Sequence, residues 1–365
     1  MKRYFHFAFI LLALWVNITP KTQGEISWRQ CLRQKAEWYG GAEAARVADN
    51  LLLYQRASGG WPKNTDFAIP LNEPKKKELL RKKNQTDSTI DNGGTYTPMR
   101  YLAKVYLATR EKRCKESFIK GLDYLLQAQY PNGGWPQYYP RLRGYSRYIT
   151  FNDGAMIGVM KLLRDVVEKE KPFDFIDTQR RQKAAAALEK GVACILKCQI
   201  VVNGKKTVWC AQHDEKTFEP RPARSYEKAS LSGSESVGIV DYFMEIEKPS
   251  PEIIASVQAA VAWFEKAKIT GIRQIQKPAP GTPKGYDKIV IQDSAAPPLW
   301  GRFHEIGTNR PIFCSRDGVI RYQLSEISYE RRNGYGWYAS RPRDLLAERY
   351  PAWQKKYAPK TNVLK

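Results

Sequence analysis

A repeat of 74 residues constrains the fold of this chain more than any other feature of its sequence. The pattern Gln55-x4-Gly60-Trp61-Pro62 recurs as Gln129-x4-Gly134-Trp135-Pro136, and Trp209 follows at the same interval without the glycine and proline. Three units with one period predict a repeat architecture, in which each unit buries its apolar face against the next one.

Each unit is predicted to contain two helices, because apolar side chains recur at helical spacing in paired segments. The segments are marked by Met99, Leu102, Tyr106; Phe118, Leu122, Leu125; Met156, Val159, Leu163; Ala184, Leu188, Ile195; Val237, Val240, Met244; and Ile254, Val257, Val261. Such helix pairs either stack into a solenoid or curl into a toroid. Since the units are few, long and irregularly linked, we predict a mainly α fold, a short (α/α) toroid of about three helix-pair repeats.

The composition changes beyond about residue 270. Prolines interrupt the helical pattern, which returns only at residues 342–350, and the strongest strand pattern covers residues 288–292. We therefore expect helical repeats to about residue 270. Residues 271–365 are predicted to be irregular loops that lie over the helical body and form one wall of an open substrate groove.

The N-terminus has the pattern of a secretory signal peptide. A short basic start precedes an apolar stretch at residues 5–16, and polar residues follow to residue 24. This stretch is short for a membrane span, although a retained anchor is an alternative. We expect removal of residues 1–24, an exported chain in the periplasm or outside the cell, and no stable membrane insertion. The domain then covers residues 25–365, and we expect a monomer.

Charge and cysteine content narrow the choice of partners. The formal net charge of +23 would attract a polyanion. Because an exported protein meets little nucleic acid and no nucleic-acid-binding module is recognisable, an acidic polysaccharide is the favoured partner. The six cysteines permit disulfides without selecting a pairing. No local pattern around His213 or His304 supports a zinc site or a catalytic triad.

Two acidic turns precede predicted helices in adjacent repeats. Asp91 lies in the turn of residues 88–96, and Asp153 lies in the turn of residues 150–155. A toroid would bring both to the same end, where two carboxylates could bind Ca²⁺. They could instead form the acid/base pair of a glycoside hydrolase, or each could cap a helix or form an Asx-turn. The spacing leaves these three interpretations open.

Arginines form the second group of candidates. Arg221 and Arg224 lie beside prolines and could point at carboxylates of a ligand. Glu235 follows as a third acidic site member or as a partner of a helix dipole. Downstream, arginines alternate with aromatic residues in a strip that could bind carboxylated sugars, at Arg302, Arg310 and Arg316. Structural ion pairs are the alternative for all of these arginines.

Taken together, these motifs resemble the pectate lyases of polysaccharide lyase family 10, from about residue 28 to residue 353. The matching stretches are Gly59-Gly60-Trp61-Pro62-Lys63-Asn64, Thr89-Ile90-Asp91-Asn92-Gly93, Phe151-Asn152-Asp153-Gly154-Ala155, Pro222-Ala223-Arg224-Ser225-Tyr226-Glu227, Thr308-Asn309-Arg310-Pro311 and Arg316-Asp317-Gly318. The resemblance implies an (α/α) toroid that cleaves polygalacturonate by anti β-elimination with Ca²⁺.

The resemblance also implies roles for single residues. Asp153 would hold the Ca²⁺ that bridges to a galacturonate carboxylate, with Asp91 beside the same scissile region as a second metal or catalytic residue. Arg224 occupies the position of the proposed Brønsted base. Arginines at Arg302, Arg310 and Arg316, together with Lys63 and Asn92 in the shared motifs, are expected to bind substrate. Two residues depart from the family pattern, namely Gly94 and His304, which stands where tyrosine is expected.

The implied reaction requires Arg224 to be neutral when it accepts a proton. The C5 proton of galacturonate is a weak acid, and Ca²⁺ and arginines would stabilise the charge that develops when it leaves. Arginine can accept that proton only if a cationic site lowers its pKa and the medium is alkaline. We therefore expect an alkaline optimum. The alternatives are a glycoside hydrolase that uses Asp91 with Asp153 or Glu235, and a non-catalytic acidic-glycan-binding protein.

Overall fold

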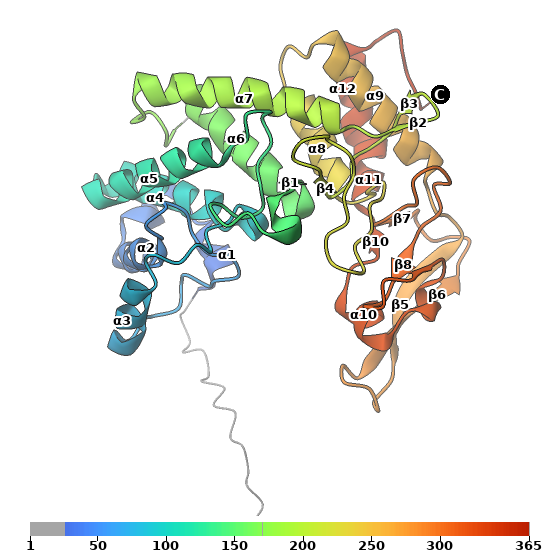
Figure 1. Cartoon of the computed structure of the whole chain (residues 1–365), viewed down its shortest axis with the longest axis horizontal. Coiled ribbons are helices and arrows are strands. Elements are labelled where there is room, and N and C mark those ends of the chain that lie inside the picture. Colours follow the sequence, from blue (N-terminus) through green and yellow to red (C-terminus); the bar gives the residue numbers. More distant parts are fainter. Residues whose placement is uncertain (1–25, 170, 365) are drawn as a thin grey trace, which may run out of the picture.

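The computed structural model describes residues 26–169 and 171–364, so the predicted signal peptide lies outside the described residues. Helix pairs form the body of the molecule (Figure 1). They are α4 (Tyr96–Thr109) with α5 (Lys112–Ala128), α6 (Ala155–Val167) with α7 (Thr178–Cys198), and α8 (Glu235–Met244) with α9 (Pro251–Lys266). This confirms the mainly α toroid of helix pairs.

Shorter elements complete the chain. The remaining helices are α1 (Trp28–Cys31), α2 (Ala42–Tyr54), α3 (Glu73–Arg81), α10 (Tyr329–Gly334), α11 (Arg341–Asp344) and α12 (Tyr350–Tyr357). Two-residue strands pair as β1 (Ile149–Thr150) with β4 (Gln212–His213), β2 (Val201–Val202) with β3 (Lys205–Lys206), β7 (Trp300–Gly301) with β10 (Tyr338–Ala339), and β8 (Phe313–Cys314) with β9 (Ile320–Arg321). Among the described residues, no helix is both long enough and apolar enough to span a bilayer.

The repeated tryptophans lock each loop onto the helix that precedes it. Each indole is fully buried, and its Nε1–H donates to a carbonyl near the end of that helix. The pairs are Trp61 with Leu51 (2.8 Å), Trp135 with Leu125 (2.8 Å), Trp209 with Ile195 (2.7 Å) and Trp300 with Phe264 (2.7 Å). The structure therefore confirms the repeat and adds a fourth unit, which the 74-residue spacing did not reveal.

The repeated glutamines join neighbouring units. Each side-chain Nε2 donates to a carbonyl of its own loop and to a carbonyl in the second helix of the next unit. These pairs of acceptors are Gly59 and Ser117 for Gln55, Gly133 and Ala187 for Gln129, and Thr207 and Ser256 for Gln199. Because all three amides are mostly or fully buried, these bonds fix the register between successive units.

Gly133 provides a stability test of this joint. Its φ is +94°, and a Cβ there would lie 2.0 Å from the Lys190 carbonyl oxygen of α7. We expect Gly133→Ala to lower the free energy of unfolding by about 3 kcal/mol, from backbone strain and steric overlap together. Gly144→Ala is the matched control, since φ is +51° and the space around it is open. It should lower that free energy by only about 1 kcal/mol. Urea unfolding measures both, and equal losses would contradict the steric argument.

The C-terminal part has more regular structure than predicted. Strands β5 (Ile272–Pro278) and β6 (Tyr286–Gln292) form an antiparallel hairpin, which confirms the strand at residues 288–292. Its partner strand β5 was not predicted, because the prolines end β5 and shape the turn after it without interrupting the pairing. A second small core underlies this part, formed by Tyr226, Phe303, Ile312, Phe313, Cys314, Leu324, Ile327 and Trp337. The predicted return of helix is confirmed by α11 and α12.

The cysteines and the two described histidines are structural. All six cysteines are buried free thiols, and burial raises the pKa of Cys31 to about 11. His213 is fully buried, which lowers its pKa to about 4. The ring of His304 packs 5.1 Å from that of Trp263, and its Nδ1 lies 2.8 Å from the Asn309 carbonyl oxygen. The departure at His304 therefore lies in the core.

Candidate active site

Two similar 3-10 turns, Asp91–Gly93 before α4 and Asn152–Gly154 before α6, form the floor of the site. Each contains one non-glycine residue with left-handed backbone, Asn92 (φ 48°) and Asp153 (φ 49°), followed by a left-handed glycine. Asn92 is thus the counterpart of Asp153, and Asp91 is the counterpart of Asn152. The two aspartates therefore lie in equivalent turns, as expected, but at positions that differ by one residue. Asparagine and aspartate suit this position because they tolerate the left-handed region.

Asp91 is the buried carboxylate of the site, with 1% of the residue exposed. Lys63 Nζ forms an ion pair with Oδ2, Gln137 Nε2 donates to the same oxygen over 2.8 Å, and Asn152 Nδ2 lies 3.5 Å from Oδ1. Lys63 and Gln137 occupy the same repeat position, two residues after Trp61 and Trp135. Among the described residues no backbone N–H donates to the Asp91 side chain, so the interpretation of this residue as a cap is wrong.

The ion pair with Asp91 also determines the charge of Lys63. Burial tends to lower its pKa, but the hydrogen bond and charge of Asp91 raise it above the usual range. Lys63 is therefore held as a cation on Asp91.

A cavity lies beside these residues. Asn92 donates from Nδ2 to Asn64 Oδ1 over 3.3 Å. Lys63, Asn64 and Asn92 line a cavity of about 340 Å³ that also contacts Trp28 and Arg29.

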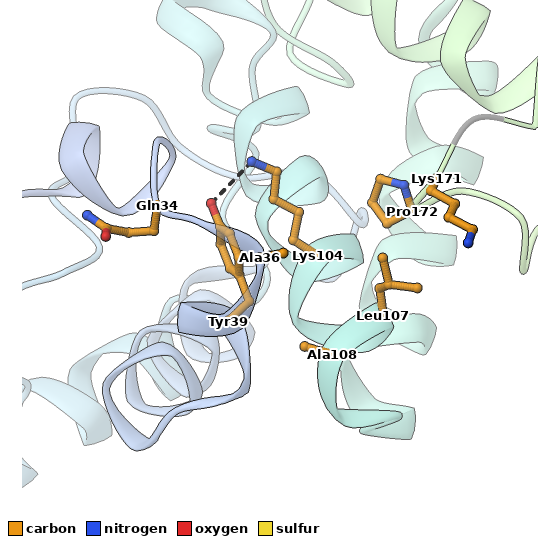
Figure 2. A pocket seen from close by; sticks show the side chains of 8 residues that line it. All are labelled: Gln34, Ala36, Tyr39, Lys104, Leu107, Ala108, Lys171 and Pro172. Atoms are coloured by element: carbon orange, nitrogen blue, oxygen red, sulfur yellow. Dashed lines mark hydrogen bonds between the residues drawn. The ribbon is translucent and has the colours of Figure 1, made fainter.

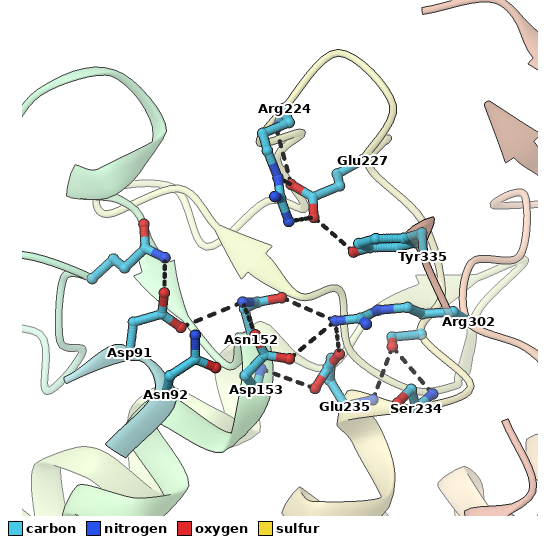
Figure 3. A network of polar contacts seen from close by, with 12 residues as sticks. Asp91, Asn92, Asn152, Asp153, Arg224, Glu227, Ser234, Glu235, Arg302 and Tyr335 are labelled. Carbon is cyan, nitrogen blue, oxygen red and sulfur yellow. Dashed lines mark hydrogen bonds and ion pairs between the residues drawn. The ribbon is translucent and has the colours of Figure 1, made fainter. Parts of the chain in front are cut away.

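Asp153 is the exposed carboxylate, with 40% of its side chain accessible. Asn152 Nδ2 donates to its Oδ2 over 3.0 Å, and Arg302 Nη2 lies 3.3 Å from its Oδ1. Because the same amide nitrogen of Asn152 also faces Asp91, the two aspartates converge as predicted (Figure 3). Their environments differ sharply, since Asp153 is open to solvent and Asp91 is enclosed.

Glu235 anchors both Asp153 and Arg302. Its Oε2 accepts from the Asp153 backbone N–H over 3.1 Å, and its Oε1 accepts from Arg302 Nη2 over 2.7 Å. Only 3% of the Glu235 side chain is exposed. Burial raises the pKa of Glu235, and the nearby positive charge of Arg302 opposes that rise. Glu235 is therefore a member of the site that holds two other residues in place.

Arg224 faces this floor from another loop and is held by Glu227. Its Nε donates to Glu227 Oε2 over 2.7 Å, Nη2 donates to Oε1, and the Arg224 backbone N–H bonds to Oε2 over 3.1 Å. The hydrogen bond to Glu227 raises the pKa of Arg224. The cationic lowering of that pKa, which the implied chemistry requires, does not come from the described residues, because the group bonded to the guanidinium is the Glu227 carboxylate. In Figure 3 the guanidinium points toward Asn152 and Asp153.

Two tyrosine rings organise the arginine-rich wall. The rings of Tyr226 and Tyr335 meet edge to face, with centroids 5.5 Å apart. Arg302 lies over Tyr335 at 4.8 Å, whereas three arginines lie around Tyr226, namely Arg331 at 4.5 Å, Arg224 at 4.9 Å and Arg316 at 5.8 Å. Cation–π contacts therefore bring Arg224, Arg302 and Arg316 into one wall.

The other arginine candidates differ. Arg316 is held by Glu330, at 3.0 Å from Nη2 to Oε1, yet 66% of its side chain is exposed. Arg310 lies 3.5 Å over the ring of Tyr322, and among the described residues no contact joins it to Asp153 or Arg224. Arg221 pairs with Asp214 at 3.0 Å, which is the loop ion pair proposed as the alternative.

A separate pocket lies where Tyr39 approaches α4 (Figure 2). Its lining consists of Gln34, Ala36, Tyr39, Lys104, Leu107, Ala108, Lys171 and Pro172. Lys104 Nζ donates to Tyr39 Oη over 3.1 Å and to the Leu32 carbonyl over 3.2 Å. None of the candidate residues lines this pocket, and Lys104 is already used by local acceptors.

Comparison with known proteins agrees with this arrangement. The sequence profile of the family described as pectic acid lyase matches residues 55–346. The chain belongs to the pectic acid lyase family. It is therefore a polysaccharide lyase. A search of curated protein sequences found no match.

Solved structures of pectic acid lyase relatives show the same fold. A mutant of a Family 10 polysaccharide lyase from Cellvibrio cellulosa, in complex with trigalacturonic acid, is 32% identical, with a TM-score of 0.74 over 91% of this chain and 97% of that one. Another structure of a Family 10 polysaccharide lyase from the same organism is 33% identical, with a TM-score of 0.72 over 87% and 94% of the two chains. These findings confirm family 10 of the polysaccharide lyases as the family to which this chain is similar.

Several residues of this lyase site were not predicted from the sequence. Asn152 and Glu227 stood inside recognised motifs, and the three-residue spacing from Arg224 to Glu227 was a usable signal for an ion pair. Tyr335 lay in an aromatic stretch without a defined role. Gln137 could have been found from the repeat, because it occupies the position that Lys63 has one unit earlier.

Proposed function

We propose that this pectate lyase cleaves polygalacturonate by anti β-elimination, with Ca²⁺ and with Arg224 as the Brønsted base. The observation that carries the proposal is the convergence of an exposed carboxylate, Asp153, with two arginines, Arg302 and Arg224, in a chain of this family. A pectic substrate is supported by the complex of a relative with trigalacturonic acid.

The residues present fit a Ca²⁺ ion shared with the substrate. No group of three or more described His, Cys, Asp or Glu side chains converges as a complete metal site. Asp153 alone offers an accessible carboxylate, whereas both oxygens of Asp91 face donors. Since Ca²⁺ takes six to eight oxygen ligands, substrate carboxylate and water would supply most of them. We therefore assign the metal to Asp153 and give Asp91 a supporting position.

The other side chains then have separate tasks. When bound, Ca²⁺ would stabilise the negative charge that develops on the substrate carboxylate. Arg302, held rigidly by Glu235 and Tyr335, would bind that carboxylate. Arg316 is exposed and would bind a neighbouring sugar acid. Arg224 would take the C5 proton in its neutral form, which becomes more abundant as the pH rises.

The proposal predicts a metal-dependent product with a characteristic absorbance. Elimination leaves an unsaturated sugar at the new non-reducing end, so ultraviolet absorbance should grow on polygalacturonate with Ca²⁺ and stop when a chelator is added. The mature chain is the protein to assay. Growth unaffected by the chelator would remove the metal from the mechanism. New reducing ends without absorbance would favour a hydrolase, and retention on a polygalacturonate gel without turnover would favour a binding protein.

A further inference from the structure

Glu227 is a largely buried carboxylate that is bonded to the proposed base. Its side chain is 7% exposed, and it accepts from Arg224 through Nε, Nη2 and the backbone N–H. Tyr335 Oη donates to Glu227 Oε1 over 2.7 Å from the other part of the site. Burial tends to raise the pKa of Glu227, but Arg224 and Tyr335 lower it below the usual range. Glu227 is therefore a fixed anion behind Arg224.

The paired hydrogen bonds from Arg224 to Glu227, called the fork below, leave one guanidinium nitrogen free to act on the substrate. Glu227 occupies Nε and Nη2, and no described residue forms a hydrogen bond with Nη1. The guanidinium points toward Asn152 and Asp153 (Figure 3), where the scissile region would lie. A planar guanidinium held at two nitrogens keeps its third nitrogen in a fixed direction. Such alignment matters because a displacement of about 1 Å can reduce a rate about a hundredfold.

We propose that Glu227 is a positioning residue for Arg224, which directs Nη1 at the substrate and, through its charge, sets the alkaline range in which the enzyme works. This inference rests on the proposed function. It also accounts for the unexpected anion beside a base, because the carboxylate provides alignment and at the same time makes neutral Arg224 scarcer at a given pH.

Other charged and titratable groups around Arg224 do not replace Glu227. Tyr226 lies in the same loop, and Tyr335 lies after α10, with its ring 5.7 Å from the Arg224 guanidinium. Arg331 of α10 packs on Tyr226, and Arg302 packs on Tyr335. Burial raises the pKa of Tyr335 beyond its usual range. Both arginines are cations, so Glu227 is the anion bonded directly to the guanidinium.

The Glu227→Gln variant tests the inference. It keeps the size of the side chain but removes the charge and one arm of the fork. We expect kcat on polygalacturonate to fall by about tenfold to a hundredfold at saturating substrate, with KM changed less than about threefold. We also expect any levelling of log kcat at high pH to occur about one pH unit lower, because the neutral form of Arg224 becomes more abundant at a given pH.

Two further variants separate positioning from folding. Tyr335→Phe removes only the hydroxyl that bonds to Glu227, and it should reduce kcat several-fold without a large change in KM. Glu43→Gln is the matched control, because Glu43 holds Arg46 in α2 through a fork with the same three-residue spacing. This control should keep the native kcat and pH profile, and unfolding curves of all three variants should show that they are folded.

The outcomes distinguish this inference from the proposed function. If the wild-type chain makes no unsaturated product, the proposed function fails. A different result overturns only the positioning role of Glu227. In that case the wild-type chain is active and Arg224→Lys is not, but folded Glu227→Gln retains both the native kcat and the native pH profile. A fall in kcat with the downward pH shift supports it, whereas a loss of stability alone, with native kinetics in the folded fraction, overturns it.

Discussion

Replacing Asp153 with asparagine is expected to reduce kcat/KM on polygalacturonate about a thousandfold, which corresponds to about 4 kcal/mol. The substitution should preserve the backbone, because asparagine also tolerates the left-handed conformation that Asp153 adopts at φ 49°. It removes the accessible carboxylate of the site and leaves Arg302 with one fewer anionic partner. Initial rates of ultraviolet absorbance, measured across Ca²⁺ concentrations, give the result.

The chain offers a close control for this variant. Asp123 in α5 is also 40% exposed at its side chain and is also paired with an arginine, Arg180. Asp123→Asn should therefore change the net charge equally and leave the rate and the Ca²⁺ requirement unchanged. A second readout is Ca²⁺ binding by calorimetry, in which the native protein should bind more tightly with a galacturonate oligomer present. Native Ca²⁺ dependence in Asp153→Asn would refute the metal assignment.

Much of the fold could be predicted because the repeat carries its own contacts. The tryptophans and glutamines recur because each residue type makes the same kind of contact in successive units. Trp300 makes the same bond as the others, but the β5–β6 hairpin is inserted before it and hides the period. The small core of the C-terminal part was also invisible, because its members come from separate short segments with no shared period.

The candidate site was predictable in its members and less so in their roles. The repeat correctly brought Asp91 and Asp153 to the same place. Sequence spacing could not show that Asp91 is enclosed by Lys63 and Gln137, because that depends on side chains from two neighbouring loops meeting at one carboxylate. For Arg224, the implied chemistry required cationic surroundings. One residue, Glu227, reverses that local environment despite the net charge of +23.

Arg224→Lys is expected to lower kcat about a thousandfold at pH values below the ordinary pKa of lysine, with a smaller effect on KM because Arg302 and Arg316 remain. Lysine keeps the positive charge but cannot form the planar fork with Glu227, so the basic nitrogen loses its alignment. Arg221→Lys is the control in the same loop, since Arg221 pairs with Asp214 and among the described residues no contact joins it to Asp153 or Glu227. That control should have native kinetics.

The pH profiles of the native protein and of Arg224→Lys test the base itself. The reactive form of Arg224 is the neutral one, and Glu227 raises the pKa of Arg224. Below that pKa the neutral fraction grows about tenfold per pH unit, so native log kcat should rise with a slope near one through the alkaline range. The ordinary pKa of lysine is about 10.4, lower than that of arginine, so the residual activity of the variant should level off at a lower pH. A lysine variant with the full native rate near neutrality would contradict Arg224 as the base, because loss of the aligned guanidinium would then have no kinetic consequence.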